Sequence, residues 1–188
     1  MKFLCGTAKT CRPQATRIDR FCQKITPMKR IFSILLFAAF LCTGFVYNYG
    51  LTVAVSSKSA APGATICLDV TTRDFNNIVA AQYSMKWDPA VLKFKSVKNF
   101  GLPALNEQNF GVQSTDKGVL TFLWYDPSVR GVQFPNNGIL YNVCYDVVGQ
   151  SGDKTYFRFV DKPTTIEVGD ASGAVLPLNA VPGTIRVK

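Results

Sequence analysis

From residue 50 onward, apolar and polar residues alternate in short runs, which is the pattern of β-strands that bury one face. In the run 118–126, for example, Leu120, Phe122 and Trp124 share one face, and Leu123 and Tyr125 lie on the other. Clusters of Gly, Pro, Asn and Asp separate the runs. The pattern predicts strands at 51–57, 65–72, 78–87, 91–100, 118–126, 138–149, 155–160, 164–168 and 183–187.

The same stretch contains no amphipathic helical pattern of useful length. Two strands end at Asp-Pro pairs, Asp88-Pro89 and Asp126-Pro127, which are typical of type I turns because proline cannot donate to a strand ladder. Eight or nine short strands in about 140 residues favour two packed sheets over one open sheet. Residues 50–188 are therefore predicted to form an all-β, antiparallel sandwich.

A separate leader precedes this domain. Met28-Lys29-Arg30 and the apolar run 31–47 have the order of a secretory signal, so we assign 28–49 to a signal peptide or signal anchor. This 17-residue run spans about 25 Å as a helix, which is short for a bilayer, but no clear cleavage motif follows. Residues 1–27 are polar and aperiodic, and we predict no structure for them. With or without cleavage, 50–188 is expected to be secreted or displayed on the cell surface, touching a membrane only through the leader.

The charge distribution makes nucleic acid an unexpected partner. Eight of the 21 basic residues but only one of the 12 acidic residues lie in 1–30, so the net charge of +9 belongs mainly to the leader. The domain itself is close to neutral. Its bases are expected to be scattered, with no stripe of Lys and Arg between aromatic residues.

The residue types argue against an enzyme. The chain has no histidine, which excludes Ser-His-Asp and Cys-His catalysis and disfavours a conventional zinc site. Nothing brings a pair of carboxylates together for acid–base chemistry, and no calcium-loop spacing is present. We predict a non-catalytic domain without a metal or cofactor.

Cysteine usage agrees with export. Four cysteines lie in the leader, and only Cys67 and Cys144 lie in the domain. Two cysteines in an oxidising compartment favour one disulfide.

The ordered motifs of 61–97 resemble the opening half of a cohesin domain. They are Pro62-Gly63, the strand 65–72, the Tyr83/Met85 pair, Trp87-Asp88-Pro89 and Val91-Leu92-x-Phe94. The runs 118–126, 138–149 and 183–187 resemble the later strands of that family, so the resemblance covers about 50–188. It implies a nine-stranded jelly-roll sandwich related to carbohydrate-binding modules, whose best-known members bind dockerin domains. It also implies that strands 65–72 and 138–149 are neighbours, with Cys67 facing Cys144 across the ladder.

A candidate partner-binding face lies on strands 78–87 and 118–126. The side chains that point out of 78–87 are small or polar, so a partner can approach the backbone closely. The side chains that point out of 118–126 add an apolar centre with the hydroxyl of Tyr125. The carboxylate of Asp126, at the end of this strand, is expected to lie at the rim of the interface as a charge. The resemblance places these positions on the face by which cohesins hold dockerins. The candidate residues are Ala80, Gln82, Ser84, Thr121, Leu123, Tyr125 and Asp126.

The inward register, by contrast, assigns the remaining strand aromatics to the core: Tyr83, Trp87, Phe122, Trp124 and Tyr145. Tyr125 is then the outward aromatic of the candidate face, which favours a protein partner over a sugar. We predict a module for dockerin-type assembly or surface attachment linked to polysaccharide degradation. The alternatives are a carbohydrate-binding module for a surface polysaccharide and a structural spacer of an adhesin.

Overall fold

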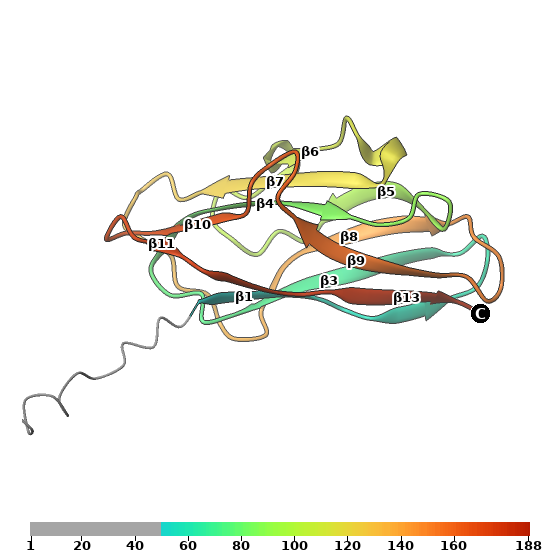
Figure 1. Cartoon of the computed structure of the whole chain (residues 1–188). Helices are drawn as coiled ribbons and strands as arrows, with labels where there is room; N and C mark the ends of the chain where they lie inside the picture. Colours follow the sequence, from blue (N-terminus) through green and yellow to red (C-terminus); the bar gives the residue numbers. More distant parts are fainter. Residues whose placement is uncertain (1–49) are drawn as a thin grey trace, which may run out of the picture. The chain divides into compact units, whose positions relative to one another are not determined.

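Two β-sheets packed face to face make up residues 50–188, the part of the chain that the computed structural model describes (Figure 1). The predicted leader, 1–27 and 28–49, lies outside the described residues. Within residues 50–188, helix is limited to two short 3₁₀ turns, η1 (Glu107–Asn109) and η2 (Thr115–Lys117), which confirms the all-β prediction. Neither turn has the length or the apolar character needed to cross a membrane. The strands are β1 (Leu51–Val55), β2 (Lys58–Ala60), β3 (Thr65–Arg73), β4 (Ile78–Lys86), β5 (Leu92–Lys98), β6 (Phe110–Gly111), β7 (Val119–Tyr125), β8 (Ile139–Val147), β9 (Lys154–Val160), β10 (Glu167–Asp170), β11 (Val175–Leu176), β12 (Leu178–Val181) and β13 (Gly183–Val187).

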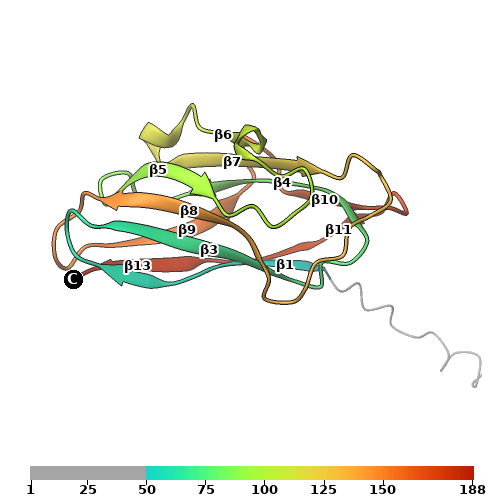
Figure 2. The same ribbon diagram turned by 180° about the vertical axis from the view of Figure 1, so that it is seen from behind.

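The first sheet has the order β12-β1-β3-β8-β5, and Figure 2 shows it from its outer side. The second sheet, in front in Figure 1, runs β11-β10-β4-β9-β13-β2. One edge of β4 pairs with β7, which in turn pairs with β6, while the other edge is shared between β10 and β9. Strand β4 is therefore the centre of the second sheet.

The two ends of the domain tie the sheets together. Strand β1 pairs in parallel with β12 in the first sheet, and β2 pairs in parallel with β13 in the second. The switch occurs at residues 56–57 near the start of the domain and at Pro182 near its end, where the missing N–H interrupts the ladder. Strand β12 was not predicted. The predicted strand 164–168 is displaced, since β10 begins only at Glu167.

The core confirms the predicted inward register. Tyr83, Trp87, Phe122, Trp124 and Tyr145 are all buried between the sheets. Within the second sheet Tyr83 stacks on Phe122 at 4.7 Å between centroids, and Phe122 stacks across on Tyr141 of the first sheet at 5.2 Å. The Tyr83 and Tyr141 hydroxyls share a buried hydrogen bond of 2.8 Å. Burial raises the pKa of both hydroxyls, so both are neutral at physiological pH.

The tyrosine hydroxyls of the core supply a matched pair of stability predictions. Within the described residues the buried Tyr145 hydroxyl has no hydrogen-bond partner, so Tyr145→Phe should leave the free energy of unfolding unchanged or raise it by about 1 kcal/mol. Tyr141→Phe removes the same atom but leaves the Tyr83 hydroxyl unpaired, and it should cost about 1–2 kcal/mol. Urea unfolding of both variants tests the difference, and equal losses would contradict this view of the core.

The disulfide lies in the centre of the first sheet. Strands β3 and β8 are antiparallel neighbours with Cys67 directly opposite Cys144, and a disulfide joins the two residues. The predicted pairing is confirmed. The bond closes a loop that contains β5 of the first sheet and β4, β6 and β7 of the second.

Candidate functional site

The outer surface of β4 and its neighbours β7 and β10 carries the candidate site. Gln82 lies between Leu123 on β7 and Glu167 on β10, and its amide donates to the Glu167 carboxylate at 3.4 Å. Ala80 lies in the next row, opposite Tyr125. Because Ala80 is small, the Tyr125 ring projects above the surface and is 62% exposed, and Leu123 is 52% exposed. The outward register predicted for Leu123 and Tyr125 is confirmed.

A hollow of about 400 Å³ adjoins Leu123 and Tyr125, with an amide-rich wall formed by the loop around η1. Asn106 caps η1: its side-chain oxygen accepts the Gln108 N–H, and its own N–H donates to the Asn109 side chain. Strand β6 stops pairing with β7 before Leu123, and the Asn109 amide donates instead to the Leu123 carbonyl at 2.9 Å. The loop is thus held against β7, with polar amides beside an apolar centre.

Asp126 differs from the prediction. It is only 4% exposed, so the prediction that Asp126 presents a charge at the rim of the interface is wrong. Its carboxylate accepts hydrogen bonds from the backbone N–H and hydroxyl of Ser128 and from the N–H groups of Arg130 and Gly131. These bonds, those from Ser128 first, lower the pKa of Asp126. Asp126 therefore holds the 127–131 loop, as its Asp-Pro turn motif predicted, and does not present a charge to a partner.

The pKa of Asp126 gives a pH prediction. Because the folded pKa is lowered, the ionised carboxylate stabilises the fold fully above its ordinary value of 3.8, and this contribution is lost as the pH falls through the folded pKa. Asp126→Asn should therefore lower the free energy of unfolding at neutral pH, and its difference from the wild type should shrink as the pH falls below 3.8 and through the lowered folded pKa. Asp116→Asn, at an exposed carboxylate for which the structure shows no hydrogen bond, is the matched control and should show no such convergence. A pH-independent difference for Asp126→Asn would contradict the assignment.

Ser84 also differs from the prediction. Its side chain points outward as predicted, but it is fully buried beneath the loop 161–166. The Ser84 hydroxyl donates to the Thr164 carbonyl at 3.1 Å and accepts the Thr164 N–H at 2.9 Å. Direct contact of Ser84 with a partner is therefore excluded in this conformation. The loop also divides the outer face of β4, with Gln82 on one side and Lys86 on the other.

Five of the predicted contact residues remain on the accessible surface. The structure adds Glu167, which no sequence signal marked because the β4–β10 pairing joins segments about 85 residues apart. We call this surface the partner face. Its residues are Ala80, Gln82, Thr121, Leu123, Tyr125 and Glu167.

On the other side of the 161–166 loop, four bases of the domain lie close together, which corrects the prediction that its bases are scattered. Lys86, Lys154, Arg158 and Arg186 are all exposed on the outer face of the second sheet. Tyr156 lies among them, on the same face of β9. We call these five residues the basic face.

No acid–base or metal centre accompanies these surfaces. Within 50–188, no three Cys, Asp or Glu side chains come together as metal ligands. The single accessible carboxylate of the partner face, Glu167, lies beside a neutral amide. The chemistry of the surface is that of contact and hydrogen bonding.

Comparison with known proteins assigns the chain to a family. The profile of the cohesin domain matches residues 51–187, and the chain belongs to this family. Comparison with curated protein sequences gave no match. Because cohesin domains are non-catalytic binding modules, the chain is one too, as predicted.

Solved cohesin structures share the fold at low sequence identity. A cohesin in the Coh-OlpA-Doc918 complex of Clostridium thermocellum is 14% identical with a TM-score of 0.62, covering 74% of this chain and 99% of that one. The sixth cohesin of scaffoldin B from Acetivibrio cellulolyticus, in complex with a Cel5 dockerin, is 19% identical with a TM-score of 0.61, covering 74% and 99%. A non-cellulosomal cohesin from the archaeon Archaeoglobus fulgidus is 18% identical with a TM-score of 0.58, covering 74% and 91%. At these identities the likeness supports the cohesin fold.

Proposed function

We propose that this cohesin domain is exported and binds a dockerin-type protein through the partner face. The observation that carries the proposal is the exposed pair Leu123 and Tyr125 at the centre of a face with polar surroundings. Similar solved cohesins, those of Clostridium thermocellum and Acetivibrio cellulolyticus, are in complexes with dockerins, which supports the same class of partner here. Such an interaction would attach polysaccharide-degrading proteins to an assembly or a cell surface.

The chemistry of the partner face fits a folded protein better than a sugar. Hot spots of protein interfaces combine aromatic and aliphatic side chains with a polar rim, and here Leu123 and Tyr125 are surrounded by Gln82, Glu167 and the amides of the η1 loop. A platform for a neutral polysaccharide, which offers no charge to bind, generally needs several exposed aromatic rings in a row, and this face has only Tyr125 within the described residues. The proposal therefore favours the protein partner over the surface polysaccharide at this face.

Export is the second part of the proposal. It rests on the signal-like segment 28–49 and on the Cys67–Cys144 disulfide, since such bonds persist in oxidising compartments. A tag placed after Lys188 should be digested by protease added to intact cells or be recovered from the medium. A tag that becomes sensitive only after lysis would place the domain in the cytoplasm.

Binding is tested with residues 48–188, which form one compact unit with its own core. The immobilised domain should retain dockerin-containing proteins from the secreted fraction of the source organism, and a purified dockerin from that set should bind in calorimetry with one site per domain. Retention of no dockerin-containing protein would count against the proposal.

A further inference from the structure

The basic face consists of cross-strand pairs of like charge. On the outer face of the second sheet, Lys86 of β4 lies directly opposite Arg158 of β9, and Lys154 of β9 lies directly opposite Arg186 of β13. Directly opposed like charges destabilise a sheet. Two such pairs on one face therefore do not serve the stability of the fold.

No salt bridge within the described residues neutralises these charges. The salt bridges in the described part of the chain, Lys58–Asp69 and Lys95–Asp146, involve none of the four bases. Asp88 lies in the same hollow, but its carboxylate accepts the Ala90 N–H at 2.9 Å. One carboxylate against four bases leaves the face strongly positive.

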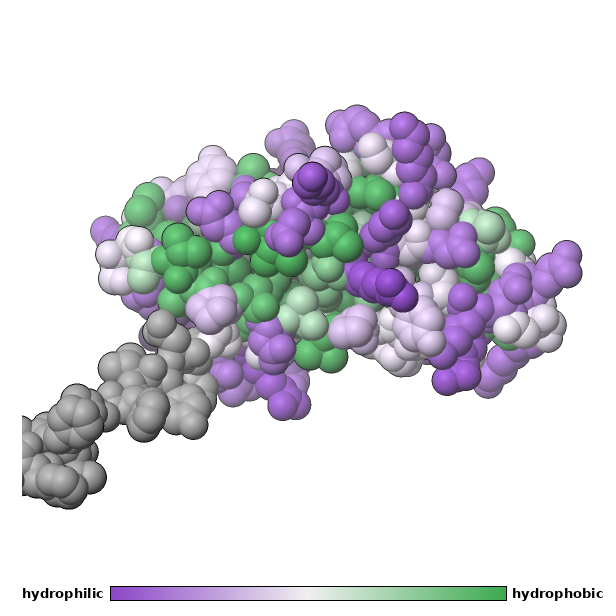
Figure 3. Space-filling model, viewed as in Figure 1, coloured by the Kyte–Doolittle hydropathy of each residue, from purple (hydrophilic) through white to green (hydrophobic). Residues whose placement is uncertain are grey.

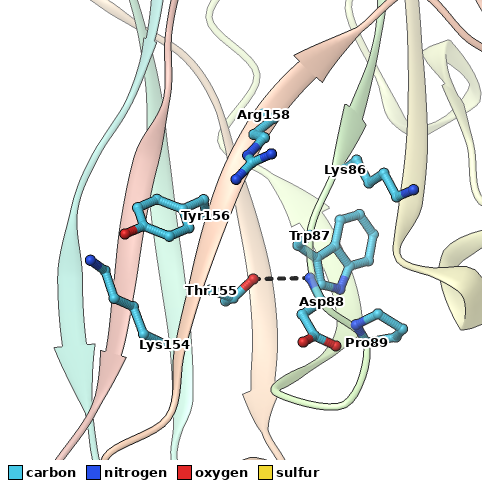
Figure 4. Close-up of a pocket in the computed structure, with 8 residues that line it drawn as sticks. All are labelled: Lys86, Trp87, Asp88, Pro89, Lys154, Thr155, Tyr156 and Arg158. Carbon is cyan, nitrogen blue, oxygen red and sulfur yellow. Dashed lines mark hydrogen bonds between the residues drawn. The ribbon is translucent and has the colours of Figure 1, made fainter.

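An exposed aromatic ring lies between the charges. Figure 4 shows Tyr156 with Lys154 and Arg158 on either side of it along β9 and with Lys86 on the neighbouring strand. The Tyr156 ring is 42% exposed, with the Lys154 ammonium 4.4 Å and the Arg158 guanidinium 5.6 Å from its centroid. The hydrogen bond from Lys154 and the charges of Lys154, Arg186 and Arg158 lower the pKa of the Tyr156 hydroxyl, which is consistent with a positive local potential.

The shape of the site is a shallow hollow, and polar side chains dominate this part of the surface in the space-filling view (Figure 3). It encloses about 390 Å³, and Lys86, Pro89, Lys154, Tyr156 and Arg158 contribute to its lining. Lys154 and Arg158 are four residues apart on one strand, which places the two like-charge pairs about 14 Å from each other. A chain with regularly spaced negative charges can contact both pairs at once, and each contact then raises the effective concentration for the other.

We propose that the basic face is a second binding site, for a linear acidic polysaccharide. An acidic protein segment is less well suited, because β9 lies between β4 and β13 and is not an edge strand to which a peptide could add. The floor of the hollow also lacks an open apolar pocket, since Trp87 and Phe157 are buried in the core. Carboxylate groups would pair with the lysines and arginines, and a sugar ring would pack beside Tyr156. The site is separate from the partner face and does not depend on a dockerin partner.

The test uses residues 48–188 and polygalacturonate, with fully methyl-esterified polygalacturonate as the neutral counterpart. Polygalacturonate should bind, the esterified polymer should not, and affinity should fall as salt rises from about 50 to 300 mM. Lys154→Gln with Arg158→Gln should weaken binding at least tenfold. The control is Lys93→Gln with Lys98→Gln, which removes two exposed charges from β5 in the other sheet. The affinity of this control for polygalacturonate should stay within twofold of the wild type. No binding at low salt, or an equal loss in the two variants, overturns the proposal.

Two further measurements distinguish a polysaccharide site from a peptide site and from a general effect of charge. Arg158→Glu places opposite charges across from each other at Lys86, so it should raise the melting temperature while abolishing polymer binding; retained binding contradicts the site. Poly-glutamate should bind at least tenfold more weakly than polygalacturonate of equal charge, and tighter poly-glutamate binding would instead identify an acidic protein segment as the ligand.

Leu123→Asp with Tyr125→Ala should leave polymer binding unchanged, so this proposal and the dockerin proposal fail independently.

Discussion

Loss of the Cys67–Cys144 disulfide is expected to lower the free energy of unfolding by about 4–5 kcal/mol. The two cysteines are 77 residues apart in sequence, so the bond closes a long loop and removes much of the chain entropy of the unfolded state. Domains of this size typically have about 5–15 kcal/mol of stability in total. The reduced domain should therefore be marginal, and folding should depend on an oxidising compartment.

The measurement is urea unfolding of the domain with and without reductant, compared with Cys67→Ala/Cys144→Ala. The wild type should lose about 4–5 kcal/mol on reduction, and the double variant should unfold at the same, lower urea concentration under both conditions. Because Cys144 is buried, the double variant also includes a small packing loss, which the reduced wild type does not share. A loss below about 1 kcal/mol in both would show that the unfolded chain is already restricted without the bond.

The sequence was sufficient for the inward and outward register of the long strands, but not for the short strands β2, β6, β11 and β12. Alternation with a period of two separated core side chains from outward ones, so the burial of Trp124 and the exposure of Leu123 and Tyr125 followed directly. Asp-Pro pairs marked strand ends correctly. The count of two cysteines in the domain predicted one disulfide, but placing Cys67 opposite Cys144 on neighbouring strands needed the family resemblance, because strand order is not contained in the alternation.

Long-range pairing accounts for what the sequence did not reveal. The outward position of Ser84 was predicted correctly, but the loop that covers it lies 80 residues further along the chain. The same limitation hid Glu167 from the partner face and the Lys86–Arg158 pair from the basic face. The Lys-x-Tyr-x-Arg pattern at 154–158 places three side chains on one face of a predicted strand. Strand alternation alone does not show that Lys86 of β4 and Arg186 of β13 lie beside them.

Asp126 shows how two local arguments compete for one residue. The end of a strand on the candidate face favoured a rim charge, while the Asp-Pro-Ser order favoured a turn in which the carboxylate accepts backbone N–H groups. The structure agrees with the turn, because three backbone N–H groups of the 127–131 loop would otherwise lack acceptors. The need of these N–H groups for an acceptor therefore determines where the Asp126 carboxylate lies, and its place at the end of a strand on the partner face does not.

The partner face predicts a large loss of affinity from two substitutions. Leu123→Asp with Tyr125→Ala should weaken binding of a dockerin-type partner by at least about 2 kcal/mol, or roughly 30-fold. The reason is the loss of the apolar centre together with a new carboxylate in the desolvated part of the interface. Both side chains are more than half exposed in the free domain, so circular dichroism and the melting temperature should stay close to the wild type.

The matched control is Val148→Asp with Tyr156→Ala, which changes an exposed aliphatic and an exposed tyrosine outside the partner face. Calorimetry with the purified partner should show unchanged affinity for this control. Equal weakening in both variants would indicate a general loss of solubility or fold, and unchanged affinity in the Leu123/Tyr125 variant would move the interface elsewhere.

A third variant, Glu167→Gln, removes the one accessible charge of the partner face and should change the salt dependence and association rate more than the dissociation rate, because a rim charge acts mainly on diffusional encounter.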